Sequence, residues 1–159
     1  MKVRLATLED SDDVLSWRND SVTRSMSFET AYVDKESHNK WFLDTLENPN
    51  QVLVIGYQRS TKVGIVRFAL QKNCIGISIN MNAEMRGKGL APNLLVESEE
   101  FIRGKKGCKT LIAEIKEENL ASVKTFTKAG YKFSFKEKRH AGIVNIYKKK
   151  LIHSQPKLK

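Results

Sequence analysis

The stretch CIGISINMNAEMRGKGLAPNLL, residues 74–95, decides the fold of this chain. Its first half alternates between two kinds of residue: the apolar ones are Ile75, Ile77, Ile79 and Met81, and the polar or small ones are Gly76, Ser78, Asn80 and Asn82. Because alternate side chains of a strand point to opposite faces, this pattern predicts a β-strand over Ile75–Asn82 with its apolar face in the core. A helix is predicted over Pro92–Arg103, so the segment between them leads from a strand into a helix.

The turn between this strand and helix is short, basic and poor in side-chain bulk, and it consists of Arg86, Gly87, Lys88, Gly89, Leu90 and Ala91. Glycines allow backbone N–H groups at a helix start to close around a diphosphate. The ATP-binding P-loop pattern does not fit, because Lys88 is followed by Gly89 and not by Ser or Thr. The dinucleotide fingerprint does not fit either, because Pro92 occupies the place of its third glycine. The turn therefore predicts a diphosphate site of another kind.

A second informative segment is ENLASVKTFTKAGY, residues 118–131. It predicts a helix over Leu120–Ala129. Asn119 suits the N-cap position or a side-chain donor to a ligand, and Gly130 suits the left-handed position that follows a helix. Taken alone, the segment is an ordinary amphipathic helix with good caps.

Together the two segments resemble the GNAT superfamily of acetyl-CoA-dependent N-acetyltransferases. The pyrophosphate loop of that family reads Arg/Gln-x-x-Gly-x-Gly/Ala, and the residues that match it in register are Arg86, Gly89 and Ala91. The family's later helix ends beside the thiol of coenzyme A, and its pattern is matched by Asn119, Ser122, Phe126, Lys128 and Gly130. The two motifs come in the family's order, with a predicted strand between them.

The resemblance implies that acetyl-CoA is the co-substrate and that no metal is needed. Its pantetheine arm would bond backbone groups of the strand, and its pyrophosphate would lie over the loop. The cofactor-binding residues that the resemblance implies are Ile79, Asn80, Met81, Arg86, Gly87, Lys88, Gly89, Leu90, Ala91, Asn119, Phe126 and Lys128.

The chain departs from the family at the usual general acid. Many members carry a tyrosine seven residues after the asparagine, where its hydroxyl can protonate the departing thiolate, but this chain has Phe126, which has no proton to give. An acid must then come from elsewhere, for which Tyr131, Tyr147 or an ordered water are candidates, or the thiolate leaves with electrostatic help from backbone amides. Ser78 and Asn80 would point toward the acceptor amine, and each could position a water that takes its proton. The catalytic residues stay open among Ser78, Asn80 and Tyr131.

The pattern of the whole chain predicts one α/β domain over residues 1–150 and a basic tail over residues 151–159. The predicted strands are Lys2–Thr7, Val52–Tyr57, Lys62–Leu70, Ile75–Asn82, Lys109–Lys116, Tyr131–Lys138 and Ile143–Lys149, and the predicted helices are Ser11–Asn19, Asp34–Asn48, Pro92–Arg103 and Leu120–Ala129. Asp10 is a candidate cap for the first helix. In the second helix His38, Trp41 or Phe42, and Thr45 share a face. The resemblance implies a mixed central β-sheet flanked by about four helices, with strands that splay apart to leave a cleft for acetyl-CoA.

The composition fits a single globular domain. The chain has 159 residues, 40% of them hydrophobic and 29% charged, and no run approaches the ~20 apolar residues of a membrane span. The first residues lack the apolar stretch of a secretory signal, so a cytoplasmic location is expected and no membrane partner. Cys74 and Cys108 are isolated in the sequence, which predicts buried thiols and neither a disulfide nor zinc.

The net charge of +10 is unevenly distributed. From Lys132 to Lys159 there are nine Lys or Arg residues and one acid, Glu137. This region is interpreted as a basic solvated surface, or as one that attracts an anionic ligand such as coenzyme A or a nucleotide-linked acceptor. A nucleic-acid partner is not expected, because no recognition motif or aromatic interleaving accompanies the charge. A homodimer is left open.

The N-terminal third should bind the acceptor. Its distinctive groups, Trp17-Arg18-Asn19-Asp20, Ser25-Met26-Ser27-Phe28, Glu36-Ser37-His38 and Trp41-Phe42, resemble GNAT enzymes that acetylate the 4-amino group of a nucleotide-linked aminodideoxysugar in pseudaminic-acid-type biosynthesis. The resemblance implies that the acceptor is bound by Trp17, Arg18, His38 and Trp41. The alternative is that both tryptophans belong to the core and that His38 is a structural hydrogen-bonding residue. Two other functions remain open: a protein N-terminal acetyltransferase of ribosomal type, and a GNAT module that binds coenzyme A without catalysis.

Overall fold

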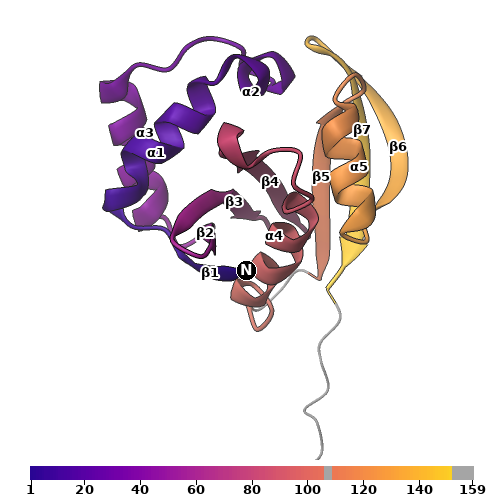
Figure 1. The fold of residues 1–159 in the computed structure, drawn as a ribbon. Coiled ribbons are helices and arrows are strands. Elements are labelled where there is room, and N and C mark those ends of the chain that lie inside the picture. The colour runs from indigo at the N-terminus through magenta and orange to yellow at the C-terminus, as the bar shows by residue number, and fades with distance from the viewer. Residues whose placement is uncertain (106–108, 152–159) are drawn as a thin grey trace, which may run out of the picture.

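The computed structural model describes residues 1–105 and 109–151. Its centre is a seven-stranded sheet in the order β1-β2-β3-β4-β5-β7-β6 (Figure 1). The strands are β1 (Lys2–Leu5), β2 (Gln51–Gln58), β3 (Thr61–Leu70), β4 (Ile75–Met81), β5 (Thr110–Lys116), β6 (Lys132–Arg139) and β7 (Gly142–Lys150). All neighbouring pairs are antiparallel except β4 and β5, which run parallel. The sheet is therefore mixed, as the family resemblance implies.

Five α-helices lie on the two faces of the sheet: α1 (Ser11–Asn19), α2 (Ser21–Met26), α3 (Lys35–Glu47), α4 (Ala91–Ser98) and α5 (Leu120–Lys128). On one side, here called the α1/α3 face, Trp17 and Phe42 pack with Leu53, Ile55 and Ile65. On the other side, the α4/α5 face, a larger core includes the helix residues Leu94, Leu95 and Phe126 and the strand residues Val66, Phe68 and Leu111. Each such side chain stabilises the fold by roughly 1.5–3 kcal/mol when it is fully buried.

The alternation predicted for β4 is present. Ile75 and Ile77 are buried, whereas Ser78 is exposed. Ile79 and Met81 pack against the core of the α4/α5 face. The paired residues Ile65 and Asn80 place the polar side of β4 on the α1/α3 face. The polar side chains of β4 thus share a face with α1 and α3.

β4 and β5 separate along their length. They pair only at Ile75 with Leu111 and at Gly76 with Ile112. β4 continues to Met81 with β3 as its partner, since Gly64 pairs with Met81. The carboxyl ends of the two parallel strands therefore splay apart, as the resemblance implies.

The backbone groups that face this gap follow from one hydrogen bond. The N–H of Asn82 donates to the carbonyl oxygen of Val63 at 2.9 Å, so residue 82 points toward β3. Successive peptide groups of a strand point to opposite edges. Asn80 consequently also faces β3, and the peptide groups of Ile79 and Met81 face the gap.

Two helical segments differ from the prediction. The sequence analysis overlooked α2, whose N-cap Asp20 accepts a hydrogen bond from the N–H of Thr23 at 3.1 Å. The helix predicted over Pro92–Arg103 is also interrupted: α4 ends at Ser98 and a 3-10 turn, Glu99–Phe101, follows. The Ser98 hydroxyl donates to the carbonyl oxygen of Leu94 at 2.6 Å, a back-bond that often bends helices.

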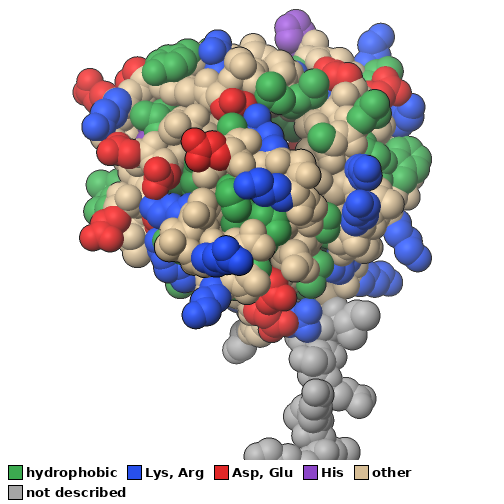
Figure 2. All heavy atoms as spheres, in the orientation of Figure 1, with side chains coloured by type: hydrophobic (Ala, Val, Ile, Leu, Met, Phe, Trp, Pro, Cys, Tyr) green, Lys and Arg blue, Asp and Glu red, His purple; other side chains and the backbone are tan. Residues whose placement is uncertain are grey.

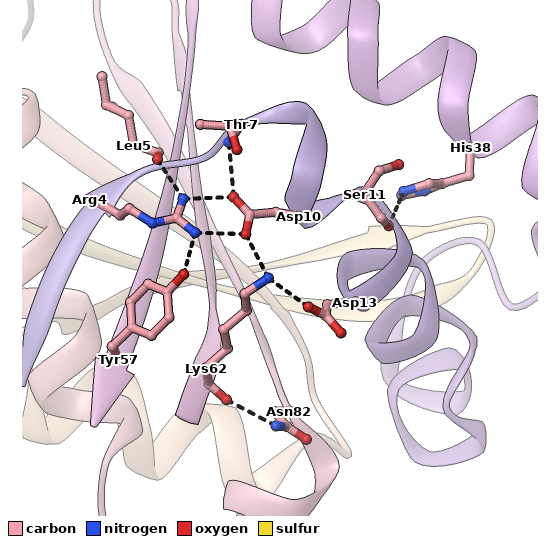
Figure 3. A network of polar contacts seen from close by, with 10 residues as sticks. All are labelled: Arg4, Leu5, Thr7, Asp10, Ser11, Asp13, His38, Tyr57, Lys62 and Asn82. Carbon is pink, nitrogen blue, oxygen red and sulfur yellow. Dashed lines mark hydrogen bonds and ion pairs between the residues drawn. The ribbon is translucent and has the colours of Figure 1, made fainter. Parts of the chain in front are cut away.

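Asp10 does not cap α1 with its side chain, contrary to the prediction. Its fully buried carboxylate instead accepts hydrogen bonds from the N–H of Thr7 at 2.9 Å and from both terminal nitrogens of Arg4 at 2.7 and 2.8 Å. Lys62 Nζ lies 2.8 Å from Asp10 Oδ1 (Figure 3). Burial alone would raise the pKa of Asp10, but the bonds from Arg4 and Lys62 outweigh it and hold that pKa below its usual range. Asp10 therefore links β1, β3 and the start of α1.

The expectation of buried thiols is wrong for Cys74. That residue is partly exposed, and its Sγ donates to Gln71 Oε1 at 3.2 Å. Cys108 and the predicted tail beyond Leu151 lie outside the described residues. Within the described part of the chain, no helix combines the length and apolar character needed to cross a bilayer.

Candidate active site

The turn from β4 to α4 has the backbone that its glycines predict. Gly87 and Gly89 have φ values of 71° and 70°, in the left-handed region that disfavours other residues. A Cβ atom built on either glycine would meet no heavy atom within 4 Å. A diphosphate can approach the main chain here because no side chain covers it, so the turn fits the pyrophosphate of acetyl-CoA.

A cleft of about 530 Å³ extends from this turn into the gap between β4 and β5. Its volume falls in the usual range for small-molecule sites, ~300–1,000 Å³. The predicted cofactor residues that line it are Ile79, Asn80, Met81, Arg86, Gly87, Gly89, Leu90, Ala91, Asn119 and Lys128. The cleft also contains the gap-facing peptide groups of Ile79 and Met81, which offer the edge of a strand to a ligand.

Two predicted cofactor residues do not line this cleft. Lys88 lies with its Nζ 3.7 Å from Met85 Sδ. Phe126 is 3% exposed and packs edge-to-face against Tyr131, with the ring centroids 5.0 Å apart. Phe126 thus lies on the core-facing side of α5.

Helix α5 borders the cleft with the caps that the sequence predicts. Asn119 Oδ1 accepts a hydrogen bond from the N–H of Ser122 at 3.2 Å, which confirms Asn119 as the N-cap. Gly130 has a φ of 94° just after the helix, which confirms the left-handed residue. The face of α5 toward the cleft carries Ser122, Thr125 and Lys128.

Helix α2 and its C-cap form part of the cleft wall through Val22, Thr23, Met26 and Ser27. Met26 and Ser27 belong to a group expected to help bind the acceptor, whereas Val22 and Thr23 were not predicted. The available signal was Asp20, a favourable N-cap residue directly after the predicted end of α1. With only six residues, the helix shows no helical period in the sequence.

Arg86 joins the loop to α2. Its Nη2 donates to Asp20 Oδ2 and to Thr23 Oγ1, both at 2.7 Å. The hydrogen bond from Arg86, followed by that from the N–H of Thr23, lowers the pKa of Asp20. The guanidinium therefore anchors one wall of the cleft, in addition to the charge that it brings to the loop.

The three catalytic candidates lie in different places. Asn80 lines the cleft, whereas Ser78 is exposed on the α1/α3 face and is not part of the lining. Tyr131 is 2% exposed, and its hydroxyl donates to Glu99 Oε1 at 3.0 Å. Burial, followed by the charge of Glu99, raises the pKa of Tyr131. Lys149 also binds Glu99, with Nζ 2.8 Å from Oε2. Tyr131 thus belongs to a buried polar cluster, away from the cleft lining.

The described residues that line the cleft include no Asp, Glu, His, Cys or Tyr. Its ionisable side chains are those of Arg86, Lys124 and Lys128. The lining therefore provides hydroxyls, amides and cations, and neither a carboxylate nor an imidazole base.

The four predicted acceptor residues do not form one surface. Trp17 is 6% exposed and lies in the core of the α1/α3 face. His38 is 2% exposed, and its Nε2 donates to the carbonyl oxygen of Ser11 at 2.9 Å (Figure 3). Burial lowers the pKa of His38. Arg18 donates to the carbonyl oxygen of Glu29 at 2.6 Å. Trp41 alone of the four presents a large open surface, with 41% exposed.

A second cavity, of about 690 Å³, lies beside α1 and includes the carboxylates of Asp12, Asp13, Asp20 and Glu84. Three of these acids already have cationic partners: Asp12 pairs with Lys35 at 3.6 Å, Asp13 with Lys62 at 2.6 Å, and Asp20 with Arg86 at 2.7 Å. The cavity is therefore less acidic than its residue types suggest. In the described part of the chain, no three His, Cys, Asp or Glu residues are grouped as metal ligands.

Comparisons with known proteins identify a family with this fold and a coenzyme A site. The sequence profile of the Acetyltransferase (GNAT) domain matches residues 1–132. The structure is similar to ribosomal-protein-alanine N-acetyltransferase from Brucella melitensis, with 21% identity, a TM-score of 0.81, and coverage of 95% of this chain and 100% of that one. It is also similar to spermidine N-acetyltransferase from Vibrio cholerae in complex with CoA and spermine, with 13% identity, a TM-score of 0.83 and coverage of 94% of each chain.

An aminoglycoside acetyltransferase in complex with coenzyme A gives a TM-score of 0.79 at 16% identity, again over 94% of each chain. No curated protein sequence matches the chain significantly. Identities this low show a common fold, while the family profile spans most of the sequence and includes the loop and the cleft strand. The chain belongs to the GNAT family of acetyl-CoA-dependent N-acetyltransferases.

Proposed function

We propose that this N-acetyltransferase modifies the amine of a nucleotide-linked aminodideoxysugar, at its 4-amino group. The donor half of the proposal depends on one observation: the uncovered loop at Gly87 and Gly89 continues into a gap edged by the peptide groups of Ile79 and Met81. Acetyl-CoA supplies an activated acetyl thioester. The loop amides and Arg86 would hold its pyrophosphate, and the open strand edge would hold its pantetheine.

The transfer forms an N–C bond between the amine and the acetyl carbon and breaks the C–S bond of the thioester. The amine loses one proton and the thiol gains one. In this proposal Asn80 would hold a water that accepts the amine proton; the support is that Asn80 lines the cleft. Since the described lining contains no carboxylate, imidazole or phenol, we assign both proton transfers to water. Backbone amides would stabilise the negative charge that develops in the transition state.

Ser78 and Tyr131, two of the three catalytic candidates, have no part in this reaction, because neither lines the cleft. The hydroxyl of Tyr131 donates its hydrogen bond to Glu99 in the core, so we give Tyr131 no part in catalysis. Without an enzyme base in the cleft, kcat/KM should rise with pH as the neutral fraction of the acceptor amine rises.

The acceptor half of the proposal has support of a different kind. Trp41 presents an exposed ring on which a sugar or a nucleobase can pack. One structurally similar protein is an aminoglycoside acetyltransferase in complex with coenzyme A and kanamycin, and aminoglycosides carry their amines on sugars. Trp17 and His38 are core side chains and add nothing to the acceptor proposal, and Arg18 is used in a loop contact.

A second acceptor is favoured by the similarity to the ribosomal-protein-alanine enzyme, which covers the whole of that chain. Here the acceptor would be a protein N-terminus. An amine panel separates the two, because a peptide and a nucleotide-linked sugar share nothing except the amine.

The test is isothermal titration with acetyl-CoA, followed by a thiol-release assay on four amines: a UDP-linked 4-amino sugar, a peptide with N-terminal alanine, spermidine and an aminoglycoside. We expect binding of acetyl-CoA and the highest kcat/KM with the UDP-linked sugar. A higher kcat/KM with the peptide would contradict the sugar acceptor and indicate that the acceptor is a protein N-terminus. Binding of acetyl-CoA without thiol release on any amine would contradict the proposed reaction and favour a binding module.

A further inference from the structure

Arg67 of β3 is a cation with no part in the reaction proposed above. Arg67 pairs with Ser78 of β4, and Ile65, two residues before it, pairs with Asn80. Ile65 packs in the core of the α1/α3 face, so Arg67, with the same alternation, projects from that face as well. Its guanidinium lies 6.0 Å from the ring centre of Trp41 on α3.

The charge of Arg67 lacks a protein counter-ion. Four other arginines each pair with a carboxylate: Arg4, Arg86, Arg103 and Arg139. For Arg67, no Asp or Glu among residues 1–105 and 109–151 lies within ion-pair distance, and its recorded contact is with the ring of Trp41. The side chain is partly buried, and burial lowers the pKa of its guanidinium. A cation withdrawn from water without a counter-ion is costly, and an anionic ligand would offset that cost.

Arg67 is also close to the place of reaction. Diagonal neighbours on adjacent antiparallel strands have Cα atoms about 7–8 Å apart, and Arg67 and Asn80 are such a pair. Asn80 lines the cleft, and the exposed Ser78, two residues before it on the same face of β4, is the residue that pairs with Arg67. One ligand of sugar size can therefore place an amine near Asn80 and an acidic group near Arg67.

We propose that Arg67 and Trp41 form an anion-binding subsite for the acceptor. A phosphate or carboxylate of the acceptor accepts paired hydrogen bonds from the guanidinium, and a ring of the same molecule packs on the exposed indole. The acceptor amine then meets the donor at Asn80. This inference rests on the proposed function, and it narrows the acceptor to amines that carry a phosphate or a carboxylate.

The subsite distinguishes this acceptor from a polyamine. The acids of the second cavity are largely paired with cations of the protein, whereas Arg67 is not paired with any described acid. Among the described acids of that cavity, Glu84 is the one without such a partner, and Arg67 next to Asn80 adds an unpaired positive charge that favours an anionic acceptor over a polycation.

The test uses three amino sugars that differ in one group: glucosamine, glucosamine 6-phosphate and muramic acid, which carries a carboxylate. Each is titrated calorimetrically into the full chain with coenzyme A present. We expect the wild type to bind at least one anionic sugar roughly ten- to hundredfold more tightly than glucosamine. This ratio of affinities corresponds to the free energy of one charge-assisted hydrogen bond. The two anionic arms show whether phosphate or carboxylate fits.

In Arg67→Met, which keeps the apolar stem and removes the charge, this preference should disappear while the affinity for coenzyme A stays unchanged. Arg67→Lys should keep part of the preference, because a single charge remains without the planar fork. Lys40→Met, which removes a charge from an exposed residue of α3, should keep all of it.

Equal affinity of the wild type for all three sugars, or an unchanged preference in Arg67→Met, would overturn the inference. If Arg67→Met does not fold, the decision rests on Arg67→Lys and on the wild type, whose preference must shrink as salt rises. These titrations need no turnover. An enzyme that releases no thiol with any amine would contradict the proposed reaction and still give a clear answer about the subsite.

Discussion

At the scale of single residues, Gly89 is where the donor site is most sensitive to substitution. Its φ of 70° is an outlier for a β-branched residue, and such strain costs roughly 1–3 kcal/mol. A side chain would also occupy the open space over the loop amides. We therefore expect Gly89→Val to lose acetyl-CoA binding in calorimetry while it keeps a cooperative thermal transition.

The matched control is Gly142→Val. Gly142 also has a positive φ, 114°, and a Cβ there would also meet no heavy atom within 4 Å, but it is the first residue of β7, directly after the turn from β6. It should show a similar loss of thermal stability and normal acetyl-CoA affinity. Normal affinity in Gly89→Val would show that the loop does not hold the pyrophosphate.

Phe126 departs from the family pattern, and its burial decides what a tyrosine would do there. The ring packs on Tyr131 and is absent from the cleft lining. A hydroxyl added by Phe126→Tyr would be buried, and without a partner it costs about 1–3 kcal/mol. We expect a lower melting temperature and kcat changed by less than about tenfold, against the ~10²–10⁴-fold that a positioned general acid contributes. A rise in kcat of about a hundredfold or more would show that the new hydroxyl reaches the leaving thiolate.

At the scale of elements, α2 depends on Asp20 for two things at once. Asp20 caps the helix through the N–H of Thr23 and holds Arg86 at 2.7 Å. Asp20→Asn keeps an oxygen for the cap and loses the ion pair, whereas Asp20→Ala loses both, and a lost cap costs roughly 0.5–2 kcal/mol. We expect the KM for acetyl-CoA to rise in both variants and further in Asp20→Ala, as measured by steady-state kinetics.

The control for these variants is Asp44→Ala, an exposed acid on α3. It removes the same charge at a distance from the loop and should leave the KM for acetyl-CoA unchanged. Equal KM values for Asp20→Ala and the wild type would mean that α2 covers the cleft without supporting the loop.

The elements also show which features the sequence could predict. β4 was predictable because period-two alternation records which side of a strand is buried, and Asn119 and Gly130 were predictable because caps are local. α2 was overlooked because a helix of six residues has too few turns to display a period. Asp10 was misassigned because its partners, Arg4 and Lys62, come from other strands, and sequence order does not show such contacts.

At the scale of the whole molecule, the site is a product of the splayed sheet. The loop and α5 could be predicted as parts of the donor site from the family motif, but the acceptor residues could not. Trp17 and Trp41 look alike in sequence, and only packing makes one buried and the other exposed. Charge is also distributed by fold: acidic side chains gather over α1 and α3, and Lys and Arg over α5, β6 and β7 (Figure 2). Of these cations, Lys124 and Lys128 of α5 line the donor cleft, where coenzyme A would bring several negative charges.

The Asp10 cluster joins distant parts of the fold and should contribute strongly to global stability. Asp10 is fully buried and serves two cations, Arg4 and Lys62. Removal of one partner from a buried ion pair typically costs about 3–5 kcal/mol, because the remaining charge is left uncompensated. We expect a loss of that size for Asp10→Asn in urea unfolding, and little change for Asp12→Asn, an exposed acid in the first turn of α1. A loss below about 1 kcal/mol would place the cluster among ordinary surface pairs.

The last prediction concerns the pH dependence of stability through His38. Its ring is buried and its pKa is lowered by that burial, so the folded state resists protonation, while the unfolded chain titrates near its usual value of about 6.5. Below that pH the unfolded state binds more protons than the folded state, and the free energy of unfolding therefore falls as pH falls. The stabilising difference is fully present above pH ~6.5 and decreases through the range below it. Asp10, whose pKa is also lowered, acts in the same direction in a separate and more acidic range.

His38→Gln isolates the first of these ranges. The glutamine amide can still donate to the carbonyl oxygen of Ser11 but does not titrate. Urea unfolding of the wild type from pH 8 to pH 5 should show a declining free energy of unfolding, and in His38→Gln that decline should be smaller while the decline below pH 4 persists. His140→Gln, at the turn between β6 and β7, is the control and should keep the wild-type curve. If His38→Gln and the wild type lose stability in parallel from pH 8 to pH 5, His38 is protonated as easily in the folded protein as in the unfolded chain.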